Sequence, residues 1–289
     1  MDFRIRDATA ADKEIVAAFT QDTFEWGDYI ASAFDRWLAD PDAKLVVAVD
    51  GDDRPVAMGR GAMVSSTELW LQGARVHPDW RRRGIASAID ATIERWALEY
   101  NAQVSRLAVE DWNLPARRQV ERIGMRATGT WVVARRRLST GGPSLATNGG
   151  RRPPPKDRLT AAVSAEAAPA YMAWSVGALG KAARQLLAIG WTWRRLTIDD
   201  LIRAAQGAAF WMSPAGWVMA AVADGTLEIG WLESGPDEVG DLCSAMIDLA
   251  AELGVSRIDI KVPDVEWLTR TLESHGFDVN RVVLYAKAL

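Results

Sequence analysis

The chain has 289 residues and a mass of 31.7 kDa, which is enough for about two domains that each bury a core of their own. Its 34 Lys and Arg against 38 Asp and Glu give a formal net charge of −4, and its apolar runs are too short to span a membrane. The second half is the more acidic one, which argues against a nucleic-acid surface there. One Cys and two His exclude an internal disulfide and zinc sites of the Cys/His type, so we expect no metal. The first residues are acidic where an export signal would be basic and apolar, which predicts a cytoplasmic protein.

The first half alternates strand and helix patterns. Apolar runs and alternations bounded by turn residues predict strands over 3–6, 44–49, 55–63, 68–76, 105–109 and 130–134. Apolar residues at helical spacing, with Thr9 as a cap and Gly124 as a stop, predict helices over 9–19, 29–38, 84–100 and 115–123. The resulting order, β-α-α-β-β-β-α-β-α-β, indicates an α/β domain over residues 1–138 with an α+β mixed sheet.

The second half repeats much of this order after a linker. Residues 139–158 are rich in Gly and Pro, also contain Ser and Asn, and include three consecutive prolines, which is typical of an extended linker. Beyond it, a helix is expected over 169–189, followed by strands and helices over 191–196, 197–205, 209–212, 217–223, 227–233, 239–253, 257–262, 265–274 and 281–287. Aligning the end of each half places Gly124 opposite Gly276, which predicts a tandem duplication with its second domain over 159–289.

The most informative stretch runs from Arg75 to Ser87, RVHPDWRRRGIAS, where a strand passes through a turn rich in Arg and Gly directly into a helix. Backbone N–H groups in such a turn and in the first helical turn have no partner inside the helix, and the helix dipole adds partial positive charge. A pyrophosphate fits this arrangement. Gly84 and Ala86 are small enough to let phosphates approach the backbone closely.

The R-x-x-G-x-A pattern that begins at Arg81 resembles the acetyl-CoA signature of the GNAT acetyltransferase superfamily. The N-x-x-A pattern that begins at Asn113, with Gly124 and Met125 downstream, resembles the second signature of the same family. The resemblance covers residues 3–138 in element order as well as in motif. It implies two tandem GNAT-like domains, of which the first uses acetyl-CoA as its co-substrate.

The resemblance also implies roles for individual residues. The Val76 N–H would polarise the thioester carbonyl, as a fixed donor facing the charge that appears in the transition state. Asn113 would contact the pantetheine arm of CoA, and Arg117 would reach the nucleotide phosphates. The residues expected to bind acetyl-CoA are Ala74, Arg75, Val76, Arg81, Arg82, Arg83, Gly84, Ile85, Ala86, Ser87, Asn113 and Arg117.

Two catalytic groups that the resemblance implies are absent. Val120 stands where the family has a tyrosine acid, and Gln72 stands where many members have a glutamate base. The carboxylates that could replace the base are Glu25, Glu110 and Glu68, with Asp22 and Asp28 near the first of them. Acids beside aromatic residues such as Trp26 and Tyr29 favour a cationic amine as the acceptor.

The second half lacks the features of a phosphate loop. Its corresponding segment, residues 234–241, has three acids and no Arg, so we expect this domain to bind no CoA and to act as a degenerate GNAT half that walls the acceptor cleft. Cys243 lies in an apolar helical pattern and is expected to pack in the core. His77 and His275 are expected to be structural, the former because no acid neighbours it at a useful spacing.

Together these features predict an acetyl-CoA-dependent N-acetyltransferase that transfers acetyl directly to a primary amine without a metal. The acceptor is expected to be a small molecule, and a protein or peptide amine is the alternative within enzymes. A non-catalytic acyl-CoA-binding sensor is the alternative outside enzymes, because the Tyr and Glu are missing. A monomer or homodimer is expected, with no nucleic-acid or membrane partner.

Overall fold

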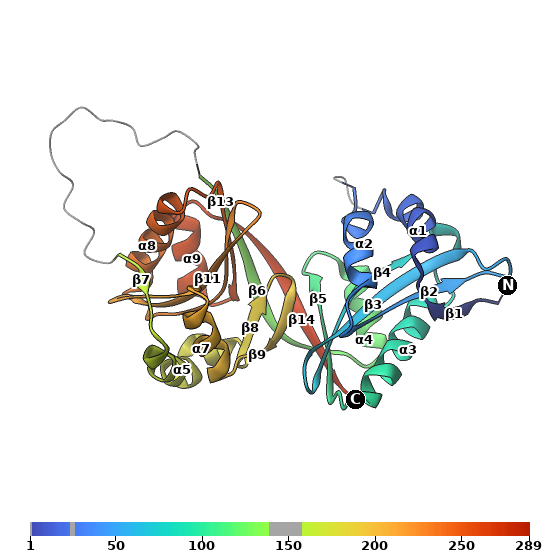
Figure 1. The fold of residues 1–289 in the computed structure, drawn as a ribbon, viewed down its shortest axis with the longest axis horizontal. Coiled ribbons are helices and arrows are strands. Elements are labelled where there is room, and N and C mark those ends of the chain that lie inside the picture. Colours follow the sequence, from blue (N-terminus) through green and yellow to red (C-terminus); the bar gives the residue numbers. More distant parts are fainter. Residues whose placement is uncertain (1, 24–26, 139–157) are drawn as a thin grey trace. The chain divides into compact units, whose positions relative to one another are not determined.

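The computed structural model describes residues 2–23, 27–138 and 158–289. They form two compact units, and Figure 1 shows the helices and strands of both. The first unit contains Met1–Val109, Asn113–Ala127 and Tyr285–Leu289, and the second contains Glu110–Trp112 and Thr128–Leu284. Except for Arg158, the predicted linker over 139–158 lies outside the described residues. No helix in the described ranges is both long and apolar enough to cross a membrane.

The first unit has the elements predicted for the first half. Its strands are β1 (Arg4–Asp7), β2 (Ala43–Val49), β3 (Pro55–Ser65), β4 (Glu68–Val76) and β5 (Val104–Glu110). Its helices are α1 (Lys13–Thr20), α2 (Ile30–Leu38), α3 (Ile85–Glu99) and α4 (Leu114–Arg122), with short 3-10 turns η1 (Ala10–Asp12) and η2 (Pro78–Trp80). Strands β1 to β4 pair antiparallel in sequence order, and β5 pairs parallel with β4. The predicted mixed α/β fold class is confirmed.

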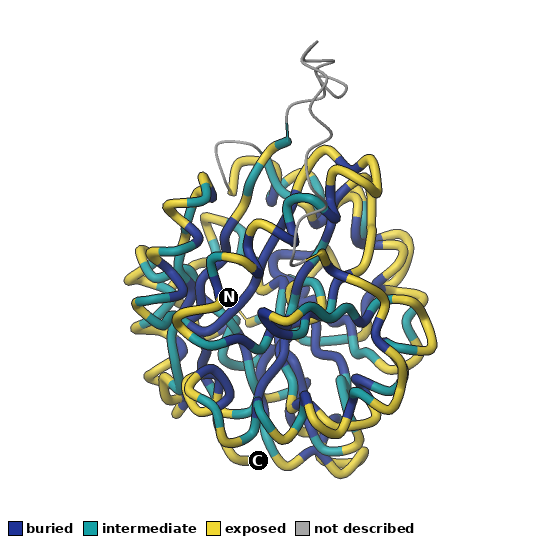
Figure 2. The backbone as a smooth tube through the Cα atoms, turned by 90° about the vertical axis from the view of Figure 1, so that its left-hand side faces the viewer, coloured by how far each residue is buried: buried dark blue, intermediate teal, exposed yellow. Residues whose placement is uncertain are grey.

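The helices of the first unit cover both faces of this sheet. Buried side chains of α1 and α2, including Val16, Phe34 and Trp37, form one core with strand residues such as Val47 and Met58. The opposite face is covered by α3, which lies close to β3 because a side chain at Gly59 or Gly61 would collide with Ile89 or Ile93. The buried residues, dark blue in Figure 2, lie inside the trace, and exposed residues occupy its outer turns.

The second unit repeats the same series of strand orientations. Its strands are β7 (Thr160–Ala161), β10 (Phe210–Ser213), β11 (Gly216–Ala223), β12 (Thr226–Glu233) and β13 (Arg257–Pro263). The first four pair antiparallel, and β13 pairs parallel with β12, as β5 does with β4. Its helices are α5 (Ala167–Val176), α6 (Ala178–Ala182), α7 (Ile198–Gln206), α8 (Val239–Glu252) and α9 (Glu266–Ser274), with the 3-10 turn η3 (Ser164–Glu166).

The last strand of each half extends into the unit of the other half. Strand β6 (Arg126–Arg137) pairs antiparallel with β13 in the second unit, and β14 (Asp278–Ala288) ends in the first unit, next to β5. The units therefore differ from the predicted domains of 1–138 and 159–289. The pattern of a strand predicts that it forms, but two strands with equivalent patterns do not reveal which sheet each one joins.

The helix predicted over 169–189 is wrong in its last part. Residues Leu186–Ile189 form β8, which pairs antiparallel with β9 (Thr192–Arg195) as a separate hairpin. Arg184 and Gln185 have φ angles of 51° and 62°, which no helix continues, so the apolar residues that follow can form a strand.

A repeated ion pair supports the predicted duplication. Arg6 binds both carboxylate oxygens of Asp12 at 2.8 Å, and the Thr9 N–H donates to the same carboxylate at 2.7 Å. Asp200 accepts the same set of bonds at 2.7–2.8 Å from Arg194 and the Thr197 N–H. The R-x-x-T-x-x-D spacing is identical at the two places.

Candidate functional site

The turn between β4 and α3 presents a row of backbone N–H groups. Arg82 and Gly84 both adopt positive φ, 63° and 76°, and Gly84 is the N-cap of α3 without any side-chain cap. The first bond of the helix runs from the Ala88 N–H to the Gly84 carbonyl at 3.0 Å. Across the described ranges, no acceptor is found for the N–H groups of residues 82–87. Alternating backbone conformations and an uncapped helix start together form a concave anion site.

The side chains of the turn leave the backbone accessible. A Cβ atom at Gly84 would meet nothing within 4 Å, so open space lies directly above the N-cap. The Arg81 Nε donates to the Val76 carbonyl at 3.4 Å, and Arg83 donates to the Asp79 carbonyl at 2.9 Å while its guanidinium lies 4.6 Å from the centre of the Trp80 ring. The arginines therefore lie beside the anion site and add positive charge to it.

Strand β4 contains a bulge that turns its end away from β5. Arg60 of β3 pairs with Gln72 and Met58 pairs with Arg75, so one more residue lies between the partners on β4 than on β3. Gly73 sits in this bulge with φ 71°, against the Trp37 ring. Pairing between β4 and β5 covers only Glu68–Trp70 with Val104–Arg106, although both strands continue. The sheet therefore opens between the last residues of β4 and those of β5.

The Val76 amide faces this opening. The His77 N–H donates to the Val56 carbonyl of β3 at 2.8 Å. Successive residues of a strand direct their N–H and C=O groups to opposite edges, so those of Val76 point away from β3. The bond from Arg81 to the Val76 carbonyl agrees with that direction. The predicted oxyanion donor is thus available at the opening, one turn away from the anion site.

Arg75 and Asp28 bind each other on the opposite side of β4. The Arg75 Nε donates to Asp28 at 2.7 Å, the Asp28 side chain is 1% exposed, and the Arg75 guanidinium lies 5.5 Å from the centre of the Tyr29 ring. The Arg75 side chain therefore contacts the start of α2 rather than the anion site. Asp28, one of the predicted carboxylates, is an ion-pair partner here.

Among the predicted replacement bases, Glu68 is not brought to Val76. Glu68 is buried in an ion pair with Arg106 and accepts a bond from Ser65 at 2.9 Å. It lies eight residues before Val76 on an extended strand, roughly 26 Å away, which excludes direct proton transfer at that amide. Glu110 belongs to the second unit, and Glu25 lies outside the described residues.

The predicted CoA contacts on α4 have structural partners. The Asn113 Oδ1 caps α4 by accepting the Ala116 N–H at 3.2 Å. The Arg117 Nε donates to the Tyr285 hydroxyl at 3.1 Å, and that hydroxyl donates to Glu121 at 3.0 Å. Sequence reasoning missed Tyr285 because it lies 168 residues from Arg117 along the chain.

An acidic pair on α3 was also missed. Asp90 and Glu94 are 9% and 7% exposed, and the Lys287 Nζ of β14 lies 2.7 Å from Glu94. Burial, and then repulsion from Glu94, raise the pKa of Asp90 to about 7. The sequence pattern that could have revealed this pair is two acids, Asp90 and Glu94, four residues apart within an apolar helical pattern.

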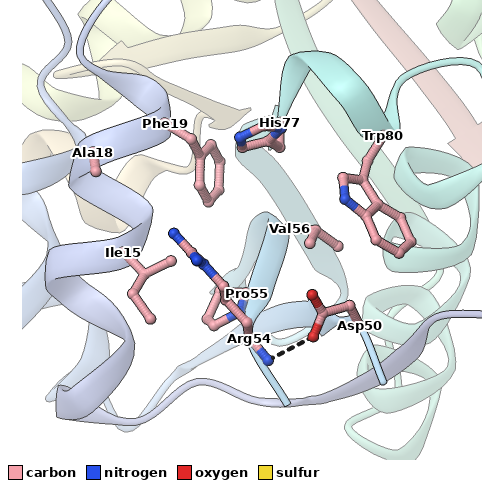
Figure 3. A pocket seen from close by; sticks show the side chains of 9 residues that line it. All are labelled: Ile15, Ala18, Phe19, Asp50, Arg54, Pro55, Val56, His77 and Trp80. Atoms are coloured by element: carbon pink, nitrogen blue, oxygen red, sulfur yellow. Dashed lines mark hydrogen bonds between the residues drawn. The ribbon is translucent and has the colours of Figure 1, made fainter. Parts of the chain in front are cut away.

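A cavity of about 340 Å³ lies on the α1 side of the first unit (Figure 3). It is lined by Ile15, Ala18, Phe19, Asp50, Arg54, Pro55, Val56, His77 and Trp80. Phe19 and His77 meet edge to face at 5.8 Å, and Trp80 forms another wall. The expectation that no acid neighbours His77 is wrong, because Asp79 lies 3.8 Å from its Nδ1. Asp79 is only two residues after His77, and the short η2 turn brings its carboxylate close to the His77 ring.

The second unit differs at the positions that form the anion site in the first. Glu238 is the N-cap of α8, its carboxylate would collide with a side chain at Gly235, and the Val239 N–H is bound to the Gly235 carbonyl. Strand β12 has a bulge at Gly230, as β4 has at Gly73, but the backbone of Ala188 in the β8–β9 hairpin packs directly on it. Cys243 is fully buried, and burial raises its thiol pKa to about 12, as expected for a packing residue.

Residues 12–125 match the family profile described as Acetyltransferase (GNAT) family. Residues 12–125 thus form a domain of the GNAT acetyltransferase family, and that family uses acetyl-CoA. A GCN5-related N-acetyltransferase from Sphaerobacter thermophilus superposes with a TM-score of 0.69 at 16% identity, over 99% of this chain and 95% of that one. An acetyltransferase described as putative, from Thermoplasma acidophilum, gives 0.61 at 17% identity, over 99% and 100%.

These two likenesses concern the fold, and they extend over both units. No curated protein matches the chain in sequence. Among the described residues, no group of three or more His, Cys, Asp or Glu side chains is placed to hold a metal ion.

Proposed function

We propose that this protein transfers the acetyl group of acetyl-CoA to the primary amine of a small molecule. The observation that carries the proposal is the uncapped start of α3 next to the opening of the sheet. It combines unpartnered N–H groups over residues 82–87, positive φ at Gly84, and a Val76 amide that faces the opening. The first unit offers this combination, and the second has an acidic loop and a covered bulge at the equivalent positions. One acetyl-CoA per chain is therefore expected.

In the proposed reaction most contacts with acetyl-CoA are made by backbone groups. The N–H groups of Arg83 to Ser87 hold the pyrophosphate, and Ala74 to Val76 run beside the pantetheine arm as an extra strand edge would. The amine attacks the thioester carbon while the Val76 N–H donates to the oxygen that becomes negative. Gln72 cannot accept a proton, so the amine loses its proton to water.

The cavity beside His77 is the proposed position of the acceptor. His77 follows Val76 directly in the sequence, and its ring lines the cavity (Figure 3). A volume of about 340 Å³ is at the lower end of what small-molecule sites have. Phe19 and Trp80 supply aromatic walls that suit a cationic amine. This cavity supports a small acceptor over a peptide.

The assignment of the anion site is tested by Gly84→Asp with Gly84→Asn as its matched control. Both side chains have the same shape, both tolerate positive φ better than other residues, and only Asp adds a negative charge where phosphate binds. We expect calorimetric titration with acetyl-CoA to show no binding to Gly84→Asp and weakened but measurable binding to Gly84→Asn. Equal affinity of the two variants would contradict the phosphate role of this turn.

The acceptor class is tested by release of free CoA thiol from acetyl-CoA in the presence of an amine panel. The panel contains small primary amines with aromatic or aliphatic bodies, and short peptides with a free α-amine. Turnover with small amines that is reduced at least tenfold by Trp80→Ala supports the proposal. Turnover with peptides alone moves the acceptor to a protein, and binding without turnover identifies a sensor.

A further inference from the structure

The acidic pair on α3 is unusual for a helix face that packs against a sheet. Asp90 and Glu94 lie one turn apart and are almost completely buried. Lys287 binds one oxygen of Glu94, and the other oxygen, Oε1, has no hydrogen-bond partner. Within the ranges described, no hydrogen bond to the Asp90 carboxyl is found either. Burying acids without full pairing costs free energy of folding, so the presence of this pair indicates a functional role.

The strand order places this pair over the opening of the sheet. On one side α3 packs its Ile89 on Gly59 of β3, and on the other its Glu94 reaches Lys287 of β14. In the order β3-β4-β5-β14, the strands between these two contacts are β4 and β5, which separate beyond Trp70 and Arg106. The flank of α3 that carries Asp90 therefore faces the gap between β4 and β5.

Helix α4 covers the same face. Tyr285 and Lys287 are two residues apart on β14 and so point to the same side, where the first contacts α4 and the second contacts α3. Asp90, one turn before Glu94 on α3, thus lies on the sheet face that α3 and α4 share. Figure 1 shows α3 and α4 below the strands of this unit and α1 and α2 above them.

The depth of Asp90 along the opening follows from the geometry of a helix and a strand. Asp90 is six residues into α3 counted from Gly84, or about 9 Å of helical rise. Ile89, the residue before Asp90, packs on Gly59 of β3, and Gly59 lies opposite the bulge between Gln72 and Arg75 of β4. Asp90 therefore lies at the level of the bulge at Gly73. The pantetheine arm, which is proposed to run beside Ala74 to Val76, ends at this level.

We infer that Asp90 is the acid that protonates the sulfur of CoA as it leaves. This inference rests on the proposed function. The amine nitrogen forms a bond to the thioester carbon, the C–S bond breaks, and its electron pair goes to sulfur. The Asp90 carboxyl gives its proton to that sulfur and becomes a carboxylate, the amine gives its own proton to water, and solvent restores the proton on Asp90.

The surroundings of Asp90 keep it protonated for this role. Burial raises its pKa most, Glu94 on the same helix raises it further, and Lys287 on β14 lowers it, with a result of about 7. These are the charged groups that act on Asp90 from α3 and β14. At neutral pH a large fraction of Asp90 therefore carries the proton that an acid must deliver.

The test compares Asp90→Asn and Asp90→Leu with the full-length wild-type chain. Binding of acetyl-CoA is measured by calorimetry, and kcat is measured between pH 6 and 9 from thiol release with the most reactive amine of the panel. We expect both variants to bind acetyl-CoA as the wild type does and to lose about 100-fold in kcat. The Leu variant controls for packing, because it fills the site without a polar group.

The pH profile separates an acid from a packing residue. Wild-type kcat is expected to fall above about pH 7 as Asp90 loses its proton, and both variants should lack this fall. Glu94→Gln should keep the fall but move it to lower pH, because removing the Glu94 charge lowers the pKa of Asp90. Carbon-13 NMR of the Asp90 carboxyl should show a titration near pH 7 without any amine present.

Several results would overturn the inference while leaving the proposed function intact. They are a kcat of Asp90→Asn within twofold of the wild type, an unchanged alkaline fall in that variant, loss of acetyl-CoA binding by both variants, or an Asp90 titration near pH 4. A wild-type protein that binds acetyl-CoA but releases no thiol with any amine would overturn the proposed function, and the role of Asp90 with it.

Discussion

The Asp200 carboxylate joins the start of α7 to the end of β9. It accepts hydrogen bonds from Arg194 and from the Thr197 N–H and is 4% exposed. Burial alone would raise the pKa of Asp200, but these bonds lower it to about 2. A lowered pKa stabilises the folded chain fully above the unfolded value near 4, and this contribution is lost as the pH falls toward 2.

We therefore expect Asp200→Asn to lower the unfolding free energy by about 2–4 kcal/mol at neutral pH, since it leaves Arg194 without its charged partner. The difference from the wild type should shrink between pH 4 and pH 2. Thermal unfolding at several pH values measures both effects. Asp199→Asn is the control, because Asp199 is exposed on the same helix turn. An equal loss in the control would refute the role assigned to Asp200.

At the scale of single residues, backbone conformation was more predictable from the sequence than the partners of side chains. Positive φ at Gly84 and Gly124 followed from the turn and helix end in which they lie. The carboxylates Glu68 and Asp28 were plausible bases until their partners Arg106 and Arg75 were known. The role inferred for Asp90 was not predictable, because it depends on Lys287 and on a strand order that spacing alone does not reveal.

The bulge in β4 is the element that opens the sheet, and Gly73 makes it possible. Its φ of 71° strains any residue with a Cβ by roughly 1–2 kcal/mol, and a Cβ there would lie 2.7 Å from the Trp37 ring. Gly254 has a similar φ of 68° but open space around it. A comparison of the same substitution at Gly73 and at Gly254 therefore separates the cost of backbone strain from the cost of the steric collision with Trp37.

We expect Gly73→Ala to cost about 3–5 kcal/mol of unfolding free energy and Gly254→Ala to cost about 1 kcal/mol. Gly73→Ala should also weaken acetyl-CoA binding, because closing the bulge realigns β4 with β5. Chemical denaturation and calorimetry measure the two effects. Equal destabilisation by the two substitutions would mean that the contact with Trp37 is not needed to hold the bulge.

Most elements were predictable because each has a local cause. Hydrophobic period located α3 and α8, and turn residues located the β2–β3 hairpin. The β8–β9 hairpin was not predicted, because a short apolar segment such as Leu186–Ile189 has the same composition in a buried helix and in a buried strand. Its position on Gly230 depends on contacts with residues far away in the sequence.

At the scale of the whole molecule, the exchanged strands make the two halves interdependent. The first unit includes Tyr285–Leu289, whose Tyr285 is fully buried and whose Lys287 is the ion-pair partner of Glu94. The duplication was predictable from the repeated element order. The exchange was not, because β6 and β14 follow equivalent helices and have equivalent patterns.

We expect a chain that ends at Leu284 to lose acetyl-CoA binding, although the anion site lies about 200 residues earlier. Removing a fully buried aromatic side chain costs about 3–5 kcal/mol, and removing Lys287 leaves Glu94 buried without its cation. Calorimetry and hydrogen exchange of α3 measure this effect. Tyr285→Phe is the control, because it keeps the ring and removes only the hydroxyl. Full binding by the shortened chain would show that the first unit is stable without its last strand.

The strand exchange also determines when the site can form during synthesis. Ribosomes add about 5–20 residues per second, so the roughly 160 residues between the end of the α4 segment and Tyr285 take about 8–30 s to make. Throughout that time the nascent chain already contains residues 82–87, which form the proposed phosphate site. It does not yet contain Tyr285–Leu289, which belong to the same unit. The proposed acetyl-CoA site is therefore expected to be complete only on nascent chains that already include Tyr285–Leu289.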